Sequence, residues 1–241
     1  LRPQYRKVEG KLVIQSAIDY AKICNAVVKG VRKTTVGASK VACGVTGPRG
    51  NNNPNSSRPA VSPLPFLRAM KKAGAKGFDA YAHHPYYGAP SESPATASPG
   101  RRGGVTLGNI DDLVRELTRL YGPKRIWLTE YGYQTNPPDG VFGVSWAKQA
   151  RYVGEAFAIA RAHPRIDMLL WFLLRDEGDP ARWQSGFISA DGKRKPSFEA
   201  FREVLRLDPG NHYALLNLQK LHEEQHQWAE AYDVREQIVQ L

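Results

Sequence analysis

The sequence predicts an α/β fold with a parallel sheet, followed by a short helical tail. Three observations support this prediction. Segments with helical spacing alternate with short apolar strands, the connections from helix to strand are short, and the long loops all follow strands. Such alternation favours parallel strands joined by right-handed crossovers.

The first half of the chain supplies two helix–strand pairs. Ile14, Ala17, Ala21 and Cys24 recur at helical spacing and predict an amphipathic helix. A loop rich in Gly, Pro, Asn and Ser then separates the first strand from the second helix. The expected elements, in order, are helix 12–33, strand 40–45, loop 46–63, helix 65–75 and strand 78–84.

The second half continues the alternation. A second loop rich in Pro, Gly and Ser precedes an apolar helix, and Asp191-Gly192 is typical of a hairpin turn between two short strands. The run that ends at Leu174 is almost entirely apolar, which suits a strand buried on both faces. The expected elements are loop 85–104, helix 107–120, strand 125–133, helix 146–157, strand 166–174, hairpin 183–197 and a helix from Phe198.

Composition limits the classes of function. The chain has 241 residues and 41% hydrophobic residues, enough for a substantial core, and no apolar run long enough to span a membrane. Residues 208–241 carry a net charge of −4, which leaves +15 on the other 207 residues and marks a boundary near Asp208. The Lys and Arg residues are scattered over predicted helices, so solvated helix faces explain them better than nucleic acid does, and an anionic polysaccharide stays open as a partner.

Three further features bear on the cellular setting. No signal peptide is visible, but the chain opens on Leu1 without an initiator Met, so we expect a processed form or a fragment, and the compartment stays open, secretion included. Cys24 and Cys43 lie on neighbouring predicted elements, and two buried free thiols are favoured over a disulfide. Neither cysteine fits a metal site, and we expect no cofactor, no membrane and no nucleic-acid partner.

Polar and aromatic residues gather where the predicted strands end. In a parallel α/β barrel, the loops after the strands build the active face. Four separate strand ends of this kind indicate a site better than one residue does. The residues concerned are Thr46; His83, His84, Tyr86 and Tyr87; Glu130, Tyr131 and Tyr133; and Trp171, Arg175, Asp176 and Glu177.

Glu130 is the central candidate. Ile126, Leu128 and Glu130 fall on one face of the predicted strand, so two apolar residues lead up to a carboxylate. A buried carboxylate needs hydrogen-bond donors or a raised pKa, and catalysis uses both arrangements. The alternative is a half-exposed Glu that ends an edge strand. Aromatic rings that stack on pyranose faces, with His and Tyr as donors, favour glycosyl transfer to water, and no phosphate-binding loop is present.

These strand ends resemble a known group of enzymes. The segments Ala82-His83-His84-Pro85-Tyr86-Tyr87, Trp127-Leu128-Thr129-Glu130-Tyr131-Gly132 and Leu170-Trp171-Phe172 look like strands six, seven and eight of clan A glycoside hydrolases, family 39-like and actinobacterial. The resemblance covers roughly residues 1–203. It implies a partial (β/α)8 TIM barrel, strands five to eight with their helices, from enzymes that cleave glycosidic bonds with retention.

The resemblance also implies roles for individual residues. Glu130 would be the nucleophile that forms a covalent glycosyl-enzyme. His83, His84, Tyr86 and Tyr131 would line the substrate-binding site, where His84 and Tyr86 bind sugar hydroxyls or hold Glu130 ionised, and Trp171 would floor the subsite of the cleaved ring. The alternatives are structural histidines and a core tryptophan.

One part of the family pattern is missing. Such enzymes carry the general acid/base as the Glu of an Asn-Glu-Pro motif that ends strand four, and no Asn-Glu-Pro occurs here. Leu1–Gly10 looks like the loop after that motif, so strands one to four and the acid/base are absent. Glu92, Asp139, Asp176 and Glu177 lie in active-face loops, but none stands where the family places its acid. We therefore expect little or no hydrolase activity from the chain alone.

The sequence leaves two hypotheses open. Residues 1–207 would be a partial glycoside hydrolase domain that needs a partner, either a second copy or the missing N-terminal half, because a half barrel leaves strand edges unpaired. Residues 208–241 resemble one tetratricopeptide repeat, a helical hairpin that bears Leu215, Leu218, Trp228, Ala231 and Tyr232. The alternative to an enzyme is a non-catalytic carbohydrate-binding or protein-interaction module.

Overall fold

The computed structural model describes residues 1–98, 103–207, 219, 223 and 227–239. The chain forms two compact units. The first contains Leu1–Gly88, Pro94–Thr129 and His163–Asp167, and the second contains Ala89–Ser93, Glu130–Ala162 and Met168–Leu241. The domain boundary expected near Asp208 lies outside the described residues.

A parallel sheet confirms the α/β prediction. Its strands run in the order β3, β4, β5 and β6, and each strand neighbours the next one along the chain. All four strands lie where the alternation placed them, with ends shifted by up to three residues. Their bounds are Ala42–Thr46 for β3, Ala80–His83 for β4, Arg125–Tyr131 for β5 and Ile166–Trp171 for β6.

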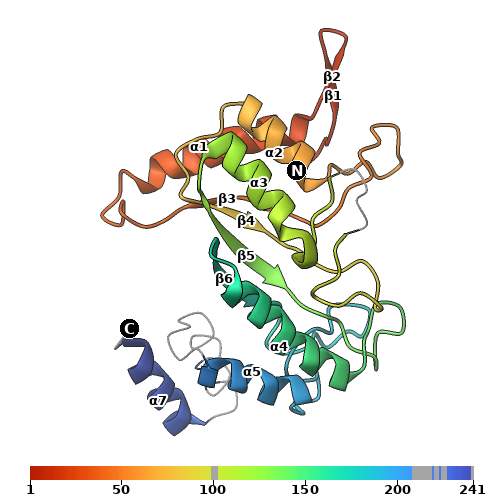
Figure 1. Cartoon of the computed structure of the whole chain (residues 1–241), viewed down its shortest axis with the longest axis vertical. Helices are drawn as coiled ribbons and strands as arrows, with labels where there is room; N and C mark the ends of the chain where they lie inside the picture. Colours follow the sequence, from red (N-terminus) through yellow and green to blue (C-terminus); the bar gives the residue numbers. More distant parts are fainter. Residues whose placement is uncertain (99–102, 208–218, 220–222, 224–226, 240–241) are drawn as a thin grey trace. The chain divides into compact units, whose positions relative to one another are not determined.

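Three helices of the first unit lie on one side of β3, β4 and β5 (Figure 1). They confirm the predicted helices, and the third is preceded by a short 3-10 turn, η1. Leu67, Met70, Leu113 and Leu117 from two of these helices are completely buried. The bounds are Gln15–Val31 for α1, Pro63–Lys72 for α2, Leu107–Asn109 for η1 and Ile110–Tyr121 for α3.

The N-terminal segment forms a hairpin that the sequence did not predict. Strands β1 (Arg6–Val8) and β2 (Lys11–Val13) pair antiparallel, and the turn between them holds Glu9 at φ 48° and Gly10 at φ 76°. Glycine adopts positive φ at little cost, so Gly10 suits this turn. The first helix therefore begins at Gln15 rather than at residue 12, where its apolar spacing overlapped the strand.

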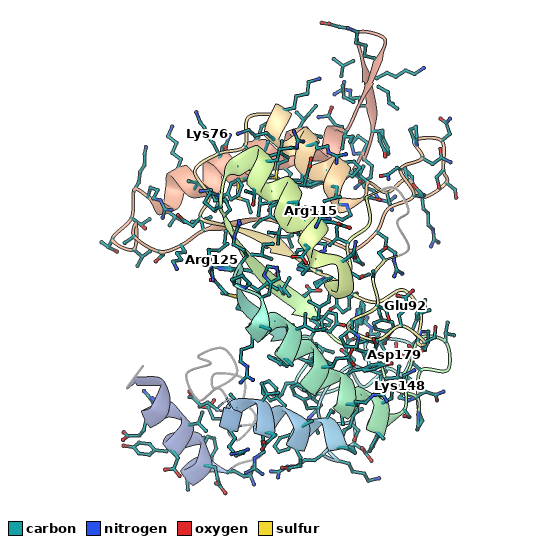
Figure 2. All side chains as sticks on the ribbon, viewed as in Figure 1. Lys76, Glu92, Arg115, Arg125, Lys148 and Asp179 are labelled. Atoms are coloured by element: carbon teal, nitrogen blue, oxygen red, sulfur yellow. A yellow bond between two sulfur atoms is a disulfide. The ribbon has the colours of Figure 1, made fainter. Side chains whose placement is uncertain are left out.

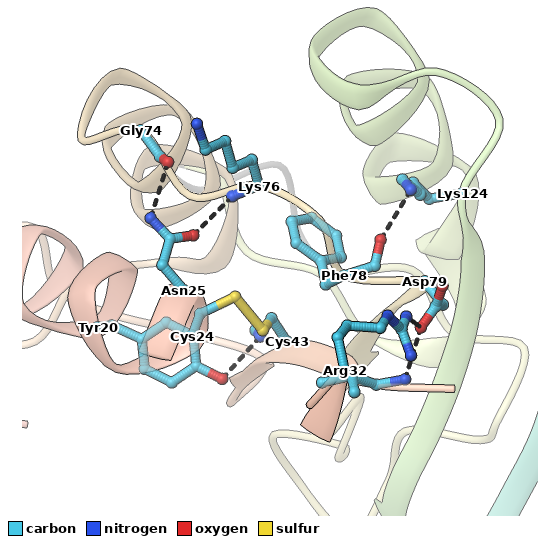
Figure 3. The surroundings of a disulfide bond; sticks show 12 residues. Tyr20, Cys24, Asn25, Arg32, Cys43, Gly74, Lys76, Phe78, Asp79 and Lys124 are labelled. Carbon is cyan, nitrogen blue, oxygen red and sulfur yellow. Dashed lines mark hydrogen bonds and ion pairs between the residues drawn. A yellow bond between two sulfur atoms is a disulfide. The ribbon is translucent and has the colours of Figure 1, made fainter. Parts of the chain in front are cut away.

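Cys24 and Cys43 form a disulfide bond, which corrects the expectation of two free thiols. Cys24 lies in α1 and Cys43 in β3, and their Cα atoms are 6.0 Å apart, a separation that a disulfide accommodates. Next to the bond, the Tyr20 hydroxyl accepts a hydrogen bond from the Gly44 backbone N–H at 2.9 Å (Figure 3). The spacing of the cysteines carried no information about this contact, because it depends on which face of α1 packs over β3.

The second unit is built around helices and an aromatic core. In the described part of this unit, the helices are α4 (Trp146–Ala162), α5 (Pro196–Leu207) and α7 (Trp228–Val239). The Phe187 ring stacks on the Phe201 ring, with the two centroids 4.6 Å apart. The centroid of the Phe157 ring lies 5.5 Å from that of Phe201. This cluster joins α4 and α5 to the segment between β6 and α5.

The hairpin predicted at 183–197 is present only as a turn. Ser189 N–H donates to the Lys193 carbonyl at 2.9 Å, and Lys195 N–H donates to the Phe187 carbonyl at 2.9 Å. A single antiparallel bridge joins Ile188 to Arg194. The turn was therefore predicted correctly, but the flanking segments are too short to count as strands.

The first helix of the predicted tetratricopeptide-like hairpin falls largely outside the described residues. Its second helix corresponds to α7, in which Ala231 and Val234 are buried while Trp228 and Tyr232 are 63% and 61% exposed. The hairpin itself therefore stays a prediction. No helix in the described part of the chain is both long enough and apolar enough to span a bilayer.

Candidate functional site

Glu130 stands at the carboxyl end of β5. Ile126 and Leu128, which share its face of the strand, are 0% exposed, whereas Glu130 is half-buried. The carboxylate therefore lies where a packed strand gives way to a more open surface. This is the position that the alternation of the strand predicted.

Tyrosines follow Glu130 directly. Tyr131 and Tyr133 are both buried, and the Tyr131 hydroxyl donates to the Tyr133 hydroxyl at 3.3 Å. The Tyr133 hydroxyl in turn donates to the Glu92 carbonyl at 3.0 Å. Between them, Gly132 lets the chain approach Phe172, the residue after β6, because a Cβ there would lie 2.8 Å from the Phe172 carbonyl oxygen. These contacts of Tyr131, Gly132 and Tyr133 fix the backbone immediately after Glu130.

Trp171 lies in the aromatic core of the second unit. Its ring stacks on Phe187 at 5.5 Å, meets Tyr131 edge-on at 6.0 Å, and is 7% exposed. The indole N–H donates to the Ser185 carbonyl at 2.7 Å. These contacts favour a core tryptophan, one of the two interpretations that the sequence allowed, and a role as the floor of a sugar subsite stays a prediction.

A buried ion pair occupies the loop after β6. The Lys195 ammonium lies 2.7 Å from one oxygen of Asp176 and 2.8 Å from the other, and their side chains are 0% and 2% exposed. Lys195 also donates to the Thr135 hydroxyl at 2.9 Å and to the Gln184 carbonyl at 3.2 Å. Burial raises the pKa of Asp176 and lowers the pKa of Lys195, while the pairing opposes both shifts. Asp176 is committed to this pair and is no free acid/base.

Two other acidic side chains in these loops hold the backbone or an arginine. Asp139 accepts hydrogen bonds from the backbone N–H groups of Val141 and Phe142, at 2.8 and 3.0 Å. Glu177 lies 3.5 Å from Arg182. Both carboxylates therefore have structural roles, and neither replaces the acid/base Glu of the missing Asn-Glu-Pro motif.

Sequence reasoning missed the polar side chains that tie this region together. Gln149 is 0% exposed, and its amide donates to the Tyr133 carbonyl at 2.8 Å and the Ser185 carbonyl at 3.1 Å. Ser197 donates to the Gln149 side-chain oxygen at 2.7 Å. The burial of Gln149 could have been predicted, because this residue falls on the apolar stripe of its helix. No sequence pattern indicates that Lys195 is buried.

The first unit contains the two predicted histidines. His83 is completely buried, with Nδ1 2.9 Å from the Thr46 hydroxyl and Nε2 3.1 Å from the Val105 carbonyl. The carbonyl only accepts, so Nε2 carries the hydrogen and Thr46 donates to Nδ1. Burial lowers the pKa of His83 to about 4. This arrangement is that of a structural histidine, the alternative that the sequence had left open.

A bulge in β3 aims Thr46 at His83. The register with β4 shifts between Gly44 and Thr46, so that Thr46 pairs with His83. Gly44 has φ +121°, and a Cβ there would come within 2.6 Å of the Tyr81 ring. Bulges of this kind commonly redirect a side chain at the end of a strand.

His84 is more accessible than His83. It is half-buried, and its Nε2 lies 2.9 Å from the hydroxyl of Thr129, the residue that directly precedes Glu130 in β5. Tyr86 is also half-buried. The six predicted site residues are therefore divided between the units, with His83, His84 and Tyr86 in the first and Glu130, Tyr131 and Trp171 in the second.

Within the described ranges, no group of three or more His, Cys, Asp or Glu side chains has the geometry of a metal site. Basic residues such as Lys76, Arg115 and Arg125 lie at separate places on the first unit (Figure 2). This scatter agrees with solvated faces rather than one basic groove.

Comparison with solved structures relates the fold to glycoside hydrolases. PfGH50B superimposes with a TM-score of 0.50 at 14% identity, over 79% of this chain and 23% of its own. A GH128 endo-beta-1,3-glucanase from Amycolatopsis mediterranei gives a TM-score of 0.48 at 16% identity, over 81% of this chain and 66% of its own. No protein-family model matches the sequence, and no curated protein resembles it closely enough to match.

The likeness to PfGH50B shows that this chain has a glycoside hydrolase-like fold. The chain spans about a quarter of the length of that protein. The family 39-like resemblance and the fusion to a tetratricopeptide repeat are finer than this likeness, and both stay predictions.

Proposed function

We propose that this chain is the C-terminal portion of a retaining glycoside hydrolase, with Glu130 as its nucleophile. The observation that carries the proposal is the position of Glu130, half-buried at the carboxyl end of a parallel strand whose preceding inward residues are completely buried. The glycoside hydrolase-like fold supports it, since such barrels place catalytic residues at the carboxyl ends of their strands.

The chemistry needs two carboxyl groups. The Glu130 carboxylate attacks the anomeric carbon and forms a glycosyl ester, while a second carboxyl protonates the departing oxygen. That second group then removes a proton from the water that hydrolyses the ester. In retaining enzymes the two groups lie about 5 Å apart.

Among the described residues, three of the four acidic candidates in these loops have structural partners, and the fourth, Glu92, is half-buried. Asp176 is paired with Lys195, Asp139 binds backbone N–H groups, and Glu177 lies against Arg182. We therefore propose that the acid/base comes from the missing N-terminal half of the barrel, and that the chain alone has little or no activity.

We propose that His84 and Tyr86, both half-buried, bind sugar hydroxyls or hold Glu130 ionised. Tyr131 is 1% exposed and its hydroxyl donates to Tyr133, which favours a structural role over substrate binding.

The missing acid/base also favours a second candidate function. In this candidate the acid/base is absent and the chain serves as a non-catalytic carbohydrate-binding or protein-interaction module. The two candidates differ in one observable, the formation of a covalent bond between sugar and Glu130.

A mechanism-based label tests the proposal. The chain would be co-expressed with the upstream segment of its gene, and the complex treated with activated 2-fluoro glycosides of several sugars. We expect mass spectrometry to find a glycosyl group on Glu130, and Glu130→Gln to abolish labelling and reduce hydrolysis at least ~10³-fold.

The matched control is Glu199→Gln, which removes an exposed carboxylate that pairs with Arg202 on α5. This variant should label and hydrolyse like the parent. Hydrolysis that survives Glu130→Gln, or a folded full barrel that takes no label from any of the sugars, would reject the enzyme and leave the binding module.

A further inference from the structure

A cavity lies beside the N-terminal hairpin, in the first unit. It is open to solvent on one side and has a volume of about 370 Å³, within the ~300–1,000 Å³ typical of ligand pockets. Its walls come from two segments distant in sequence, the stretch before β1 and the loop after β3. The lining residues are Arg2, Pro3, Gln4, Tyr5, Pro54 and Pro59.

The loop that carries Pro54 and Pro59 is held by its own asparagines. The Asn51 side-chain oxygen accepts from the backbone N–H groups of Asn53 and Ala60, both at 3.1 Å, and its amide donates to the Arg58 carbonyl at 3.0 Å. Asn52 exchanges two hydrogen bonds with Ser62, at 2.8 and 3.0 Å. The wall is therefore shaped before any ligand arrives, which reduces the entropy lost on binding.

Gln4 fastens the other wall to this loop. Its side-chain oxygen accepts from the Val61 backbone N–H at 3.2 Å and from the Ser16 hydroxyl at 3.4 Å. Its side-chain amide donates to the Leu1 carbonyl at 2.7 Å. The hydrogen bond from Val61 to Gln4 thus links the two walls of the cavity.

The lining has the chemistry of a site for a carboxylated ring. Tyr5 and three prolines present ring faces that can pack on the C–H face of a pyranose. Burial raises the pKa of Tyr5, so its hydroxyl keeps its proton and can donate to a sugar oxygen. The Arg2 guanidinium is planar and matches a carboxylate with two parallel hydrogen bonds.

The two chain segments that supply the cavity walls are predominantly basic. Residues 1–13 and 46–63 contain six basic side chains against a single acidic one, Glu9, and no acidic residue lines the cavity. Such an excess attracts an anionic ligand. The basic residues are Arg2, Arg6, Lys7, Lys11, Arg49 and Arg58.

From this geometry we infer that the cavity binds one uronic acid unit of an acidic polysaccharide, with the carboxylate on Arg2 and the ring against Tyr5 and the prolines. The inference rests on the proposed function and names the substrate class of that enzyme. The loop that supplies Pro54 and Pro59 follows Thr46, the last residue of β3, in the sequence.

Binding of uronic acid trimers to the full chain tests the inference. Trimers of galacturonate, glucuronate and mannuronate would be titrated calorimetrically, each beside its methyl ester, which keeps the rings but removes the charge. We expect one acidic trimer to bind, its ester to bind at least about tenfold more weakly, and Arg2→Gln and Tyr5→Ala to weaken binding by about ten- to a hundredfold.

Two controls give the result its meaning. Lys29→Gln removes the same charge from an exposed position on α1 and should leave affinity unchanged. Triglutamate offers carboxylates without sugar rings and should bind far more weakly than the preferred trimer. Equal affinity for triglutamate, equal affinity for the ester, no effect of Arg2→Gln, or no binding of any trimer would overturn the inference.

The test separates this inference from the proposed function. Trimer affinity is read out through Arg2 and Tyr5, whereas labelling is read out at Glu130, so the two experiments give independent results. Glu130 labelling with no response at Arg2 would reject the cavity and keep the hydrolase, whereas uronate binding without any labelling would keep the cavity and reject the hydrolase.

Discussion

Lys195 and Asp176 are charged side chains that the second unit removes almost entirely from water. Removing ions from water costs several kcal/mol each, and only the mutual attraction and the added hydrogen bonds offset that cost. The Thr135 hydroxyl and the Gln184 carbonyl supply such bonds to the ammonium. The pair therefore holds together the segments after β5 and β6 only while both partners are present.

The first prediction concerns the loss of one partner. Lys195→Met should destabilise the chain by about 3–5 kcal/mol, because Asp176 is left buried without a counter-charge. The double variant Lys195→Met with Asp176→Leu should lose much less, since no buried charge remains. Urea unfolding of the parent, both single variants and the double variant measures the coupling. Additive losses would show that the two side chains do not act as a pair.

His83 poses a related problem at the end of β4. Its burial keeps the ring neutral in the folded state, while the unfolded chain takes up a proton near pH 6.5. The folded pKa of about 4 lies below the unfolded value. The stabilisation is thus complete above about pH 6.5 and is lost as the pH falls towards 4.

We therefore predict acid sensitivity centred on this residue. Between pH 7 and pH 4 the parent should lose about 3 kcal/mol of unfolding free energy through His83. His83→Gln, which can still donate to the Val105 carbonyl, should be less stable at pH 7 and should show a flatter dependence on pH. Urea titrations at pH 7, 5.5 and 4.5 give the slopes. A variant with the slope of the parent would assign the acid sensitivity to other groups.

Among the elements, α1 is joined to β3 and to the neighbouring connections at several points (Figure 3). The disulfide bonds the middle of the helix to the strand. Asn25 donates to the Gly74 carbonyl at 3.0 Å, and Arg32 pairs with Asp79 at 2.5 Å. The helix is therefore attached along its length, and the covalent bond is its strongest single attachment.

Removal of this bond gives the third prediction. A cross-link between residues 19 apart restricts the unfolded chain, and its loss should cost about 3 kcal/mol. Cys24→Ser with Cys43→Ser should show that loss in urea, and a reductant should lower the stability of the parent by a similar amount. The double variant, which has no bond to lose, is the control and should not respond to the reductant. A parent equally stable in both redox states would contradict the prediction.

On the scale of the whole molecule, a parallel sheet of four strands has two outer strands, β3 and β6. An outer strand presents unpaired backbone groups that can recruit another chain. Val45 on β3 is 51% exposed, so this outer strand carries an exposed apolar side chain. If the chain belongs to a barrel, as we propose, closure by a partner would pair both edges.

We accordingly predict self-association of the chain when it is alone. Light scattering after size-exclusion chromatography should give a mass above 26.8 kDa at micromolar concentration, and co-expression with the upstream segment should replace this species by a 1:1 complex. Val45→Lys should weaken self-association, because a charge on an edge strand opposes pairing. The matched control Val27→Lys changes an equally exposed valine on α1 and should have no effect. If the chain is a monomer at all concentrations and does not bind the upstream segment, both proposed partners are excluded.

The features that the sequence predicted and those that it missed differ in their physical origin. Alternation and helical spacing are local, so the sequence located the strands and most helices, and it placed Glu130 at a strand end. The hairpin at Glu9-Gly10 is local, but its strands have only three residues each, too few for alternation to reveal them. The role of Lys195 and the disulfide depend on packing between distant segments. Gln149 was partly predictable. A polar residue on the apolar stripe of a helix indicates a buried hydrogen-bond network, but the sequence does not show which groups are its partners.

What the sequence by itself determined, then, is the α/β alternation and the strand that leads to Glu130, because side-chain periodicity follows from backbone geometry alone. Only the tertiary structure decided that Cys24 meets Cys43, that His83 and Asp176 serve the scaffold, and that Arg2 and Tyr5 line a cavity with Pro54. Those outcomes depend on which faces of the elements meet, and burial of apolar surface across the whole chain selects that arrangement.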